Sequence, residues 1–505
     1  RFREWSRQVR LGSPDLQEFR LFRNHPRGLA PLFFTEMWER FSFYIMLALL
    51  TLYMEAKPAE GGLGFSPEWA AQIYGMYVGL IYFTPFLGGI VADKVWGYIR
   101  TIAAGGVAMM AGHLALAGDG LAFFFAGLSL LIVGNGLFKP NISTMLGNLY
   151  AGRHDLKDQG YNIFYMGINC GALLAPITAT ILKSYGWHYA FSCASLGMLI
   201  SLVVFVSCRR FLAEGENPAR SEVSHREEAA PPEVERLRTR ALWILFAVVI
   251  FFWMAFQQNG LTLIRWSRDY TAPLETPFGE LNFRKNASIT KAINPFLVIV
   301  LTPLLVLVWE ACKRRGREVS TPRKMVAGML LTAGCYAIMA LAGGAGGDER
   351  RAVVDRLGEL EKTKETAATE AERTQAADTI AALENTSRIS VLWLVGAYFL
   401  ITVGELCISP MGLSLVSKLA PRRAAGIWMG GWFVATSLGN YLAGFLGIFW
   451  SRLSPSVFFL VLVGTSLAAM GLLWLCLPRL EAALASLKTP APAPEPELAP
   501  VGVEA

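Results

Sequence analysis

Twelve runs of about twenty mostly apolar residues, separated by short charged breaks, constrain the fold of this 505-residue chain most strongly. A bilayer core offers no water to the backbone, so a chain that crosses it must be helical or form a closed barrel, and runs of this length fit helices. The pattern predicts an all-α membrane protein with twelve transmembrane helices. We expect the spans near 31–54, 69–92, 101–120, 123–148, 161–184, 189–208, 241–264, 288–312, 323–344, 390–417, 424–448 and 455–478.

The distribution of basic residues predicts the direction of these spans. An even number of spans places both termini on one side, and the basic residues gather near that side in alternate loops. By the positive-inside rule both termini are cytoplasmic, in the plasma (inner) membrane. The net charge of +7 does not indicate nucleic acid, because the basic side chains form no single stripe with interleaved aromatics.

Composition divides the chain into segments. The polar stretch 209–240 has the character of a cytoplasmic linker between two sets of six helices. Residues 347–387 combine charge with helical spacing of apolar residues, which predicts an extracytoplasmic helix or helical hairpin between helices nine and ten. The predicted organisation is a basic N-terminus (1–30), an N-terminal bundle (31–208), the linker (209–240), a C-terminal bundle containing the insert (241–478) and a disordered Pro/Ala-rich tail (479–505).

Three charged residues interrupt the first span, in the stretch EMWERF. Glu36, Glu39 and Arg40 share one helical face because they are spaced by three and four residues. Two acids share one base, so one carboxylate lacks a full countercharge and is suited to take up and release a proton. The alternative is a buried ion-pair network that only fixes helix packing.

Two further charges stand alone in broken helices. Lys139 directly precedes Pro140 in the fourth span, and Glu405 precedes Pro410 in the tenth. A proline frees a backbone carbonyl and bends the helix, which opens space for a charged group. Because the two charges lie in opposite halves, a zwitterion could bridge them at the bundle interface. The alternatives are a lysine that extends to the membrane surface and a protonated structural acid.

Other classes of protein lack the motifs that they require. The sequence has no HExxH or GxSxG motif, and its seven cysteines show no CxxC spacing, so we predict neither an enzyme nor a metal site. We expect no cofactor beyond a proton gradient. A receptor or scaffold built like a transporter is the remaining rival.

The stretch GGIVADKVWGYIR at 88–100 is similar to a loop signature of the major facilitator superfamily. In that superfamily these residues latch two helices together and do not bind substrate. The resemblance implies the major facilitator fold, with two six-helix bundles.

Four motifs resemble a narrower family, the proton-dependent oligopeptide transporters (POT or PTR family): EMWERF, GNGLFKPNIS at 134–143, FYMGINCGALLAPI at 164–177 and GELCISPMGLSLVSKLAP at 404–421. The similarity covers about 30–210 and 240–480. It implies a proton-coupled symporter that imports di- and tripeptides by alternating access and acts as a monomer in the lipid bilayer.

The resemblance also implies roles for individual residues. Glu36, Glu39 and Arg40 would couple to protons, Lys139 would bind the carboxylate of the peptide or switch with it, and Glu405 would meet the amino group of the peptide. The remaining implied substrate-site residues are Asn169 and Asn294 as partners of the peptide backbone, Tyr44 and Tyr82 as lining, Trp432 as a wall, and Gln257 near Lys139. For Tyr82 and Trp432, interfacial anchoring or packing is the alternative.

Two departures from the family pattern affect the expected substrate. Leu47 stands where the family usually has a second arginine, and Gln257 stands where many members have a glutamate that pairs with the lysine of helix four. Together the two changes remove one positive and one negative charge. The net charge of the pocket is therefore kept, while the arrangement of charges in it changes. The alternative function is proton-coupled transport of a non-peptide small molecule or anion, such as nitrate or an organic acid.

Overall fold

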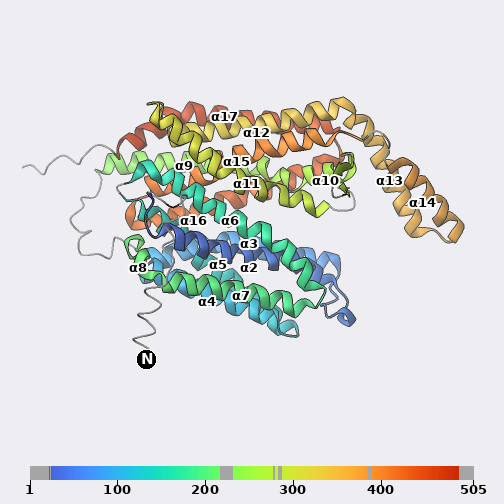
Figure 1. Cartoon of the computed structure of the whole chain (residues 1–505), viewed down its shortest axis with the longest axis horizontal. Coiled ribbons are helices and arrows are strands. Elements are labelled where there is room, and N and C mark those ends of the chain that lie inside the picture. The colour runs from blue at the N-terminus through green and yellow to red at the C-terminus, as the bar shows by residue number, and fades with distance from the viewer. Residues whose placement is uncertain are drawn as a thin grey trace, which may run out of the picture.

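The computed structural model describes residues 22, 24–151, 153–216, 231–276, 279–281, 287–384, 386 and 388–487. Most of segment 1–30, the middle of the predicted linker and the tail beyond residue 487 lie outside these residues. The described chain is almost entirely helical, and its long helices run side by side in two groups (Figure 1).

The first group, the N-terminal bundle, appears in blue to green in Figure 1. Its helices pack as α2 on α6 and α7, α4 on α5 and α7, and α3 on α5. Ser66 caps α3 by accepting a hydrogen bond from the Trp69 amide, and Pro67 supplies the preset first helical position. The helices are α2 (Leu29–Glu55), α3 (Pro67–Val91), α4 (Tyr98–Leu116), α5 (Leu121–Leu149), α6 (His154–Lys183) and α7 (Trp187–Ser207).

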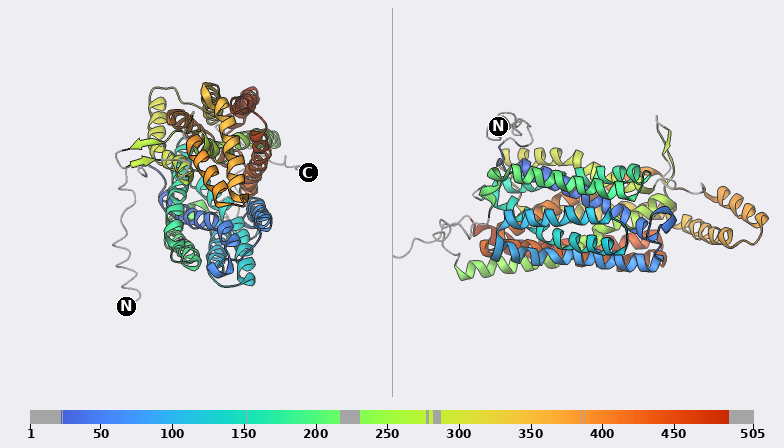
Figure 2. Two further views of the ribbon diagram at one scale, coloured as in Figure 1. Left: turned by 90° about the vertical axis from the view of Figure 1, so that its right-hand side faces the viewer. Right: turned by 90° about the horizontal axis from the view of Figure 1, so that it is seen from below.

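The second group, the C-terminal bundle, packs α12 on α15 and α17, and α9 on α16 and α17. The two bundles meet where α3 contacts α16 and where α6 contacts α11 and α15; the end-on view in Figure 2 shows both groups. The helices are α9 (Pro232–Phe256), α11 (Ala287–Arg314), α12 (Thr321–Ala342), α15 (Val391–Leu419), α16 (Ala425–Gly447) and α17 (Pro455–Ala485).

Shorter elements connect these helices. They are 3-10 turns at Pro58–Glu60, Ala213–Gly215, Gln257–Asn259, Arg422–Ala424 and Ile448–Ser451, π-helical turns at Ala92–Trp96 and Gly343–Gly347, helices α8 (Arg209–Leu212) and α10 (Thr262–Asp269), and strands β1 (Leu274–Thr276) and β2 (Gly279–Leu281). The strands form an antiparallel hairpin with Leu274 opposite Leu281.

Eleven described helices are long and apolar enough to cross a membrane by length and composition. The eleven correspond to the second to twelfth predicted spans. α2 is not among them, because Glu36, Glu39 and Arg40 interrupt its apolar sequence. The count of twelve spans and the cytoplasmic side of both termini stay predictions.

Three helices extend beyond the predicted spans. α6 begins at His154 instead of near 161, α9 begins at Pro232 inside the predicted linker 209–240, and α17 continues to Ala485 inside the predicted tail 479–505. These extra turns carry charged residues, which hydropathy excludes, yet they are good helix formers. In α9, for example, Pro232 lies at the first helical position and Glu233 in the first turn, where the helix dipole favours an acid.

The segment 347–387 contains α13 (Asp348–Thr366) and α14 (Glu370–Glu384), a helical hairpin that projects from one end of the molecule (Figure 1). Its base is held by Arg350, whose buried guanidinium donates to the backbone carbonyls of Leu383 and Glu384. Arg350 also bonds Thr386, so the two ends of the hairpin are fastened to one another.

Close helix crossings within the N-terminal bundle depend on glycine. A Cβ at Gly88 of α3 would collide with the backbone carbonyl of Gly136 in α5, whereas a Cβ at Gly79 of the same helix would meet nothing within 4 Å. We expect Gly88→Ala to destabilise the bundle by about 1–3 kcal/mol through overpacking. Gly79→Ala is the matched control and does not destabilise the bundle, because the added methyl group meets no neighbour and alanine favours the helix. Thermal melting of the two purified variants in detergent measures the difference, and equal melting temperatures would contradict the crossing.

Candidate functional site

The charged trio of α2 is buried inside the N-terminal bundle, with Glu36, Glu39 and Arg40 each at most 2% exposed. Arg40 meets Glu39 with two nitrogens, and the contact from Nη2 to Oε1 measures 2.5 Å. This forked geometry is the strong, bidentate form of an arginine–carboxylate pair. Arg40 Nη2 also donates to Asn135 Oδ1 of α5 over 3.3 Å. Arg40 therefore connects the ion pair of α2 to α5.

Glu36 is bonded much less completely than Glu39. Its Oε1 lies 3.5 Å from Arg40 Nε, and its buried Oε2 has no hydrogen-bond partner among the described residues. A buried carboxylate without sufficient partners is costly, and a proton removes that cost. The structure thus distinguishes two acids that their spacing alone treats as a unit.

Lys139 lies on α5 four residues after Asn135, on the same helical face. Its Nζ is 5.1 Å from the ring centre of Tyr82 and 4.9 Å from that of Phe433. The two rings come from different bundles, and their faces stabilise the ammonium. Within the described chain no carboxylate lies at ion-pair distance from Nζ, although Glu36 and Glu39 act on it through space.

Glu405 of α15 is 3% exposed and bonded by two neutral donors. The Tyr165 hydroxyl donates to Oε1 over 2.6 Å, and Asn294 Nδ2 donates to Oε2 over 2.8 Å. Because Tyr165 belongs to α6, the first of these bonds crosses from one bundle to the other. No cation in the described chain forms an ion pair with Glu405, so this acid is hydrogen-bonded without a countercharge.

Gln257, at the end of α9, donates from Nε2 to Asn440 Oδ1 of α16 over 2.9 Å. Asn440 also lies near the Tyr82 hydroxyl. Gln257 is thus bonded to a neutral side chain that lies close to the tyrosine beside Lys139. A glutamate at position 257 would bring a negative charge to this chain of contacts.

The remaining predicted site residues differ in how they are placed. Tyr44 is half-buried with its ring 5.4 Å from that of Phe43. Asn169 Nδ2 bonds the Tyr165 carbonyl in its own helix over 3.0 Å. Trp432 is 2% exposed, and its indole lies against Gly412; packing between α15 and α16 accounts for its position.

Side chains at the centre of both bundles keep some exposed surface. They come from long helices of both bundles, where tight packing would bury them, so solvent-accessible space remains beside these side chains, and we call this space the hollow. The half-buried polar and charged side chains are Tyr44, Tyr82, Lys139, Tyr165, Gln257, Asn294 and Asn440.

A second buried charge cluster joins the bundles near the start of α6. Asp158 accepts hydrogen bonds from Lys324 of α12 (2.7 Å) and Lys418 of α15 (2.6 Å). Thr321 and Ser414 add hydroxyl donors at 2.9 and 2.7 Å. These five side chains form the Asp158 cluster, in which one acid of the N-terminal bundle is held by two helices of the C-terminal bundle.

Asp158 and Tyr165 were not predicted from the sequence. Asp158 precedes the predicted start of its span at 161, so it counted as a loop residue. Its partner Lys418 lies 260 residues away, a separation over which no local pattern acts. Tyr165 could have been found, because it lies in the quoted stretch FYMGINCGALLAPI, four residues before Asn169 and on the same face.

The loop signature at 88–100 also joins the bundles. Asp93 accepts the backbone amides of Gly426 (3.1 Å) and Ile427 (2.9 Å), at the start of α16. The positive end of a helix dipole favours such a carboxylate. This contact is the latch between two helices that the superfamily resemblance implies.

Two helical bundles around a polar hollow, joined at one end by buried charge pairs, define a membrane transporter. A family model described as POT family matches residues 99–225, 232–351 and 365–455. The peptide transporter YePEPT of Yersinia enterocolitica is 30% identical, over 85% of this chain and 88% of its own length. A di-/tripeptide transporter of Lactococcus lactis subsp. cremoris is 31% identical, over 82% of this chain and 88% of its own.

Solved structures agree with these relatives. The crystal structure of a peptide transporter POT in complex with sulfate is 28% identical, has a TM-score of 0.61, and covers 94% of this chain and 99% of its own. The chain belongs to the POT family. It is a transporter, not an enzyme, and a multi-pass protein of the plasma (inner) membrane.

Removing the carboxylate of the Asp158 cluster leaves two lysines buried without a countercharge. We expect Asp158→Asn to cost about 3–5 kcal/mol, the usual penalty for breaking a buried ion pair. The matched control is Asp155→Asn in the same helix end, because the Asp155–Lys313 pair (2.7 Å) is exposed and contributes less than about 1 kcal/mol. Thermal melting of the purified variants measures both. Similar losses for the two variants would show that the cluster does not hold the bundles together.

Proposed function

We propose that the protein is a proton-coupled symporter that imports di- and tripeptides by alternating access of its two bundles. The observation that supports this most is a pair of opposite charges on the two bundles, neither of which has an ion-pair partner among the described residues. Lys139 of the N-terminal bundle has aromatic neighbours and no acidic partner in the described chain, and Glu405 of the C-terminal bundle has neutral donors and no cation. A short peptide carries a carboxylate and an ammonium that match these two charges.

The proton site is proposed to be the trio of α2, with Glu36 taking the proton first. Glu39 is occupied by the forked contact with Arg40, whereas Glu36 keeps an unbonded buried oxygen. The two acids are coupled, so the pair binds its proton as a unit. Protonation weakens the hold of the acids on Arg40, which contacts Asn135, one turn before Lys139 on α5. This short path joins the proton site to the proposed carboxylate anchor.

The same contacts suggest how substrate enters from one side of the membrane and leaves on the other. A proton and a peptide enter the hollow together, the peptide ammonium replaces the Tyr165 hydroxyl at Glu405, and the bundles rearrange around the bound substrate. On the cytoplasmic side deprotonation restores the Arg40 ion pair and the substrate leaves. One chain supplies every proposed contact, so we propose a monomer whose energy source is the proton gradient.

A non-peptide substrate is the second candidate. Leu47 removes a cation from the face of α2 that carries Arg40, and Gln257 offers an amide instead of a carboxylate near Lys139. A lysine without an acidic partner favours binding of an anion. The 28% identical peptide transporter solved in complex with sulfate shows an anion bound to a related protein. An anion such as nitrate or an organic acid would need Lys139 and would not need Glu405.

The proton role is tested by replacing each acid of the trio. We expect Glu36→Gln to abolish accumulation of a labelled dipeptide driven by a pH gradient in proteoliposomes, while exchange of dipeptide across the membrane continues. Glu39→Gln should abolish accumulation as well and also lower the melting temperature, because it breaks the forked contact with Arg40. Uphill accumulation by the Glu36→Gln protein would rule out its role as the proton carrier.

The two substrate anchors are tested with blocked peptides. Wild-type protein should select dialanine over both its C-terminal amide and its N-acetyl form by roughly ten- to hundredfold, the contribution of a hydrogen bond to a charged group. Lys139→Gln should lose only the selection against the C-terminal amide. Glu405→Gln should lose only the selection against the N-acetyl form. Competition with labelled dialanine uptake measures each ratio.

Labelled nitrate, offered in parallel, separates the two candidates. The anion assignment would replace the peptide one if the protein takes up nitrate and no dialanine. Nitrate uptake should then depend on Lys139 and be unaffected by Glu405→Gln. Leu47→Arg restores the family cation and should shift any anion uptake toward peptide.

A further inference from the structure

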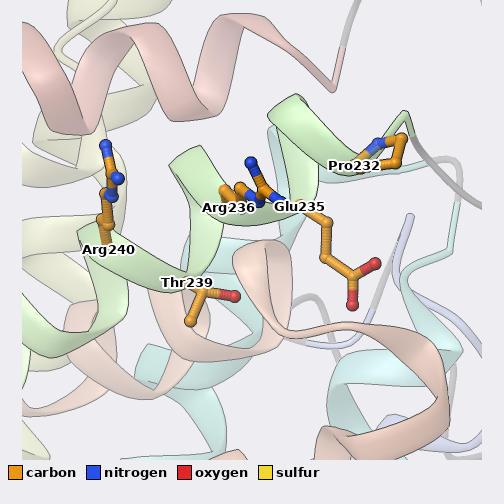
Figure 3. Close-up of a pocket in the computed structure, with 5 residues that line it drawn as sticks. All are labelled: Pro232, Glu235, Arg236, Thr239 and Arg240. Atoms are coloured by element: carbon orange, nitrogen blue, oxygen red, sulfur yellow. The ribbon is translucent and has the colours of Figure 1, made fainter.

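A surface pocket of about 390 Å³ lies at the start of α9, and none of the half-buried side chains of the hollow lines it. It is lined by Pro232, Glu235, Arg236, Thr239 and Arg240. Figure 3 shows Arg236 and Arg240 one turn apart on α9, with Glu235 directed to another side of the helix. The proposed transport cycle uses none of these residues.

Two sides of this part of α9 are already occupied. Arg238 donates to the Ser486 hydroxyl (3.0 Å) and carbonyl (2.9 Å) at the end of α17. Glu235 forms an ion pair with Arg423, in the turn before α16. Arg236 and Arg240, which are both exposed, have no ion-pair or hydrogen-bond partner within the described chain. The one acid that lines the pocket is thus engaged, and the two arginines keep their full positive charge.

The sequence of α9 indicates that these arginines lie at the membrane surface. Residues 241–264 contain no charged side chain, so Arg240 is the last charge before the apolar span. Trp243 follows on the same face, is 62% exposed and has its ring 5.5 Å from that of Trp428. Tryptophan side chains of this kind sit at the boundary between hydrocarbon and headgroups.

Helix geometry gives the distance of each arginine from this boundary along the axis of α9. Arg240 lies about 4.5 Å and Arg236 about 10 Å beyond Trp243 along the axis, at 1.5 Å per residue. The headgroup layer on each side of the hydrocarbon is about 5–8 Å thick. Both guanidinium groups can therefore reach the depth of the lipid phosphates, while Trp243 and the exposed Phe251 face the acyl chains.

We propose that Arg236 and Arg240 form a binding site for the phosphate headgroup of an anionic phospholipid. Two guanidinium groups one turn apart can each offer paired N–H donors to phosphate oxygens. An anionic headgroup has no cation of its own to oppose the two arginines, whereas a choline headgroup does. The apolar, exposed stripe below the arginines supplies the surface for the acyl chains of the same lipid.

The test uses the purified full-length protein in detergent, with lipid binding followed by native mass spectrometry. Phosphatidylglycerol and phosphatidylcholine with identical acyl chains are titrated separately, each with and without inorganic phosphate. We expect tighter binding of phosphatidylglycerol. The double substitution Arg236→Gln/Arg240→Gln should weaken it roughly thirtyfold, from about fivefold for each arginine near an anionic lipid. The charge-preserving pair Arg236→Lys/Arg240→Lys should bind phosphatidylglycerol more tightly than the glutamine pair and less tightly than the wild type, because lysine keeps the charge and loses the paired donors.

The matched control is Arg356→Gln/Arg373→Gln, which removes two exposed arginines from the α13–α14 hairpin. This control should bind phosphatidylglycerol like the wild type, and all variants should keep the wild-type melting temperature in lipid-free detergent. Equal affinity for the two lipids, equal losses in both glutamine double variants, or displacement of phosphatidylglycerol by millimolar inorganic phosphate would overturn the proposal. The last result would assign the pocket to a free anion.

Discussion

A charge inside a bundle of apolar helices must find its partner within the protein, because hydrocarbon supplies none. This constraint divides the buried charges of the transporter into two kinds. Arg40 with Glu39, Asp158 with its two lysines, and Asp93 with the amides of α16 are fully bonded. Such groups hold helices together.

The second kind of buried charge is incompletely bonded. Among the described residues, Glu36 keeps an unbonded oxygen, Lys139 lies against two aromatic rings without an ion-pair partner, and Glu405 is bonded by two neutral donors. Each lies where a proton or a charged end of a substrate would complete its bonding. Glu405 has an added importance, because its bond with Tyr165 also joins the two bundles. A substrate ammonium that takes this place would change the contact between bundles as it binds, which is the coupling that alternating access requires.

Much of the fold could be predicted from hydropathy, and the departures share one cause. The predicted spans for α3, α15 and α16 agree with the observed helices to within a few residues. A continuous apolar run of about twenty residues spans a bilayer as one helix, so its ends can be read from the sequence. α6 and α9 begin before their predicted spans and α17 ends after its span, since their charged turns contain good helix formers. The hydropathy of these turns is that of a loop.

The sequence by itself determined that Glu36, Glu39 and Arg40 share one helical face and that Lys139 and Glu405 stand in opposite halves, because helical spacing and span order follow from the chain alone. Only the tertiary structure decided which acid Arg40 holds, that Tyr165 bonds Glu405, and that Asp158 meets Lys418. Glu39 and Arg40 are neighbours in α2, whereas the partners in the other two contacts come from different helices, up to 260 residues apart. Their choice depends on how whole helices pack, which no local pattern in the sequence encodes.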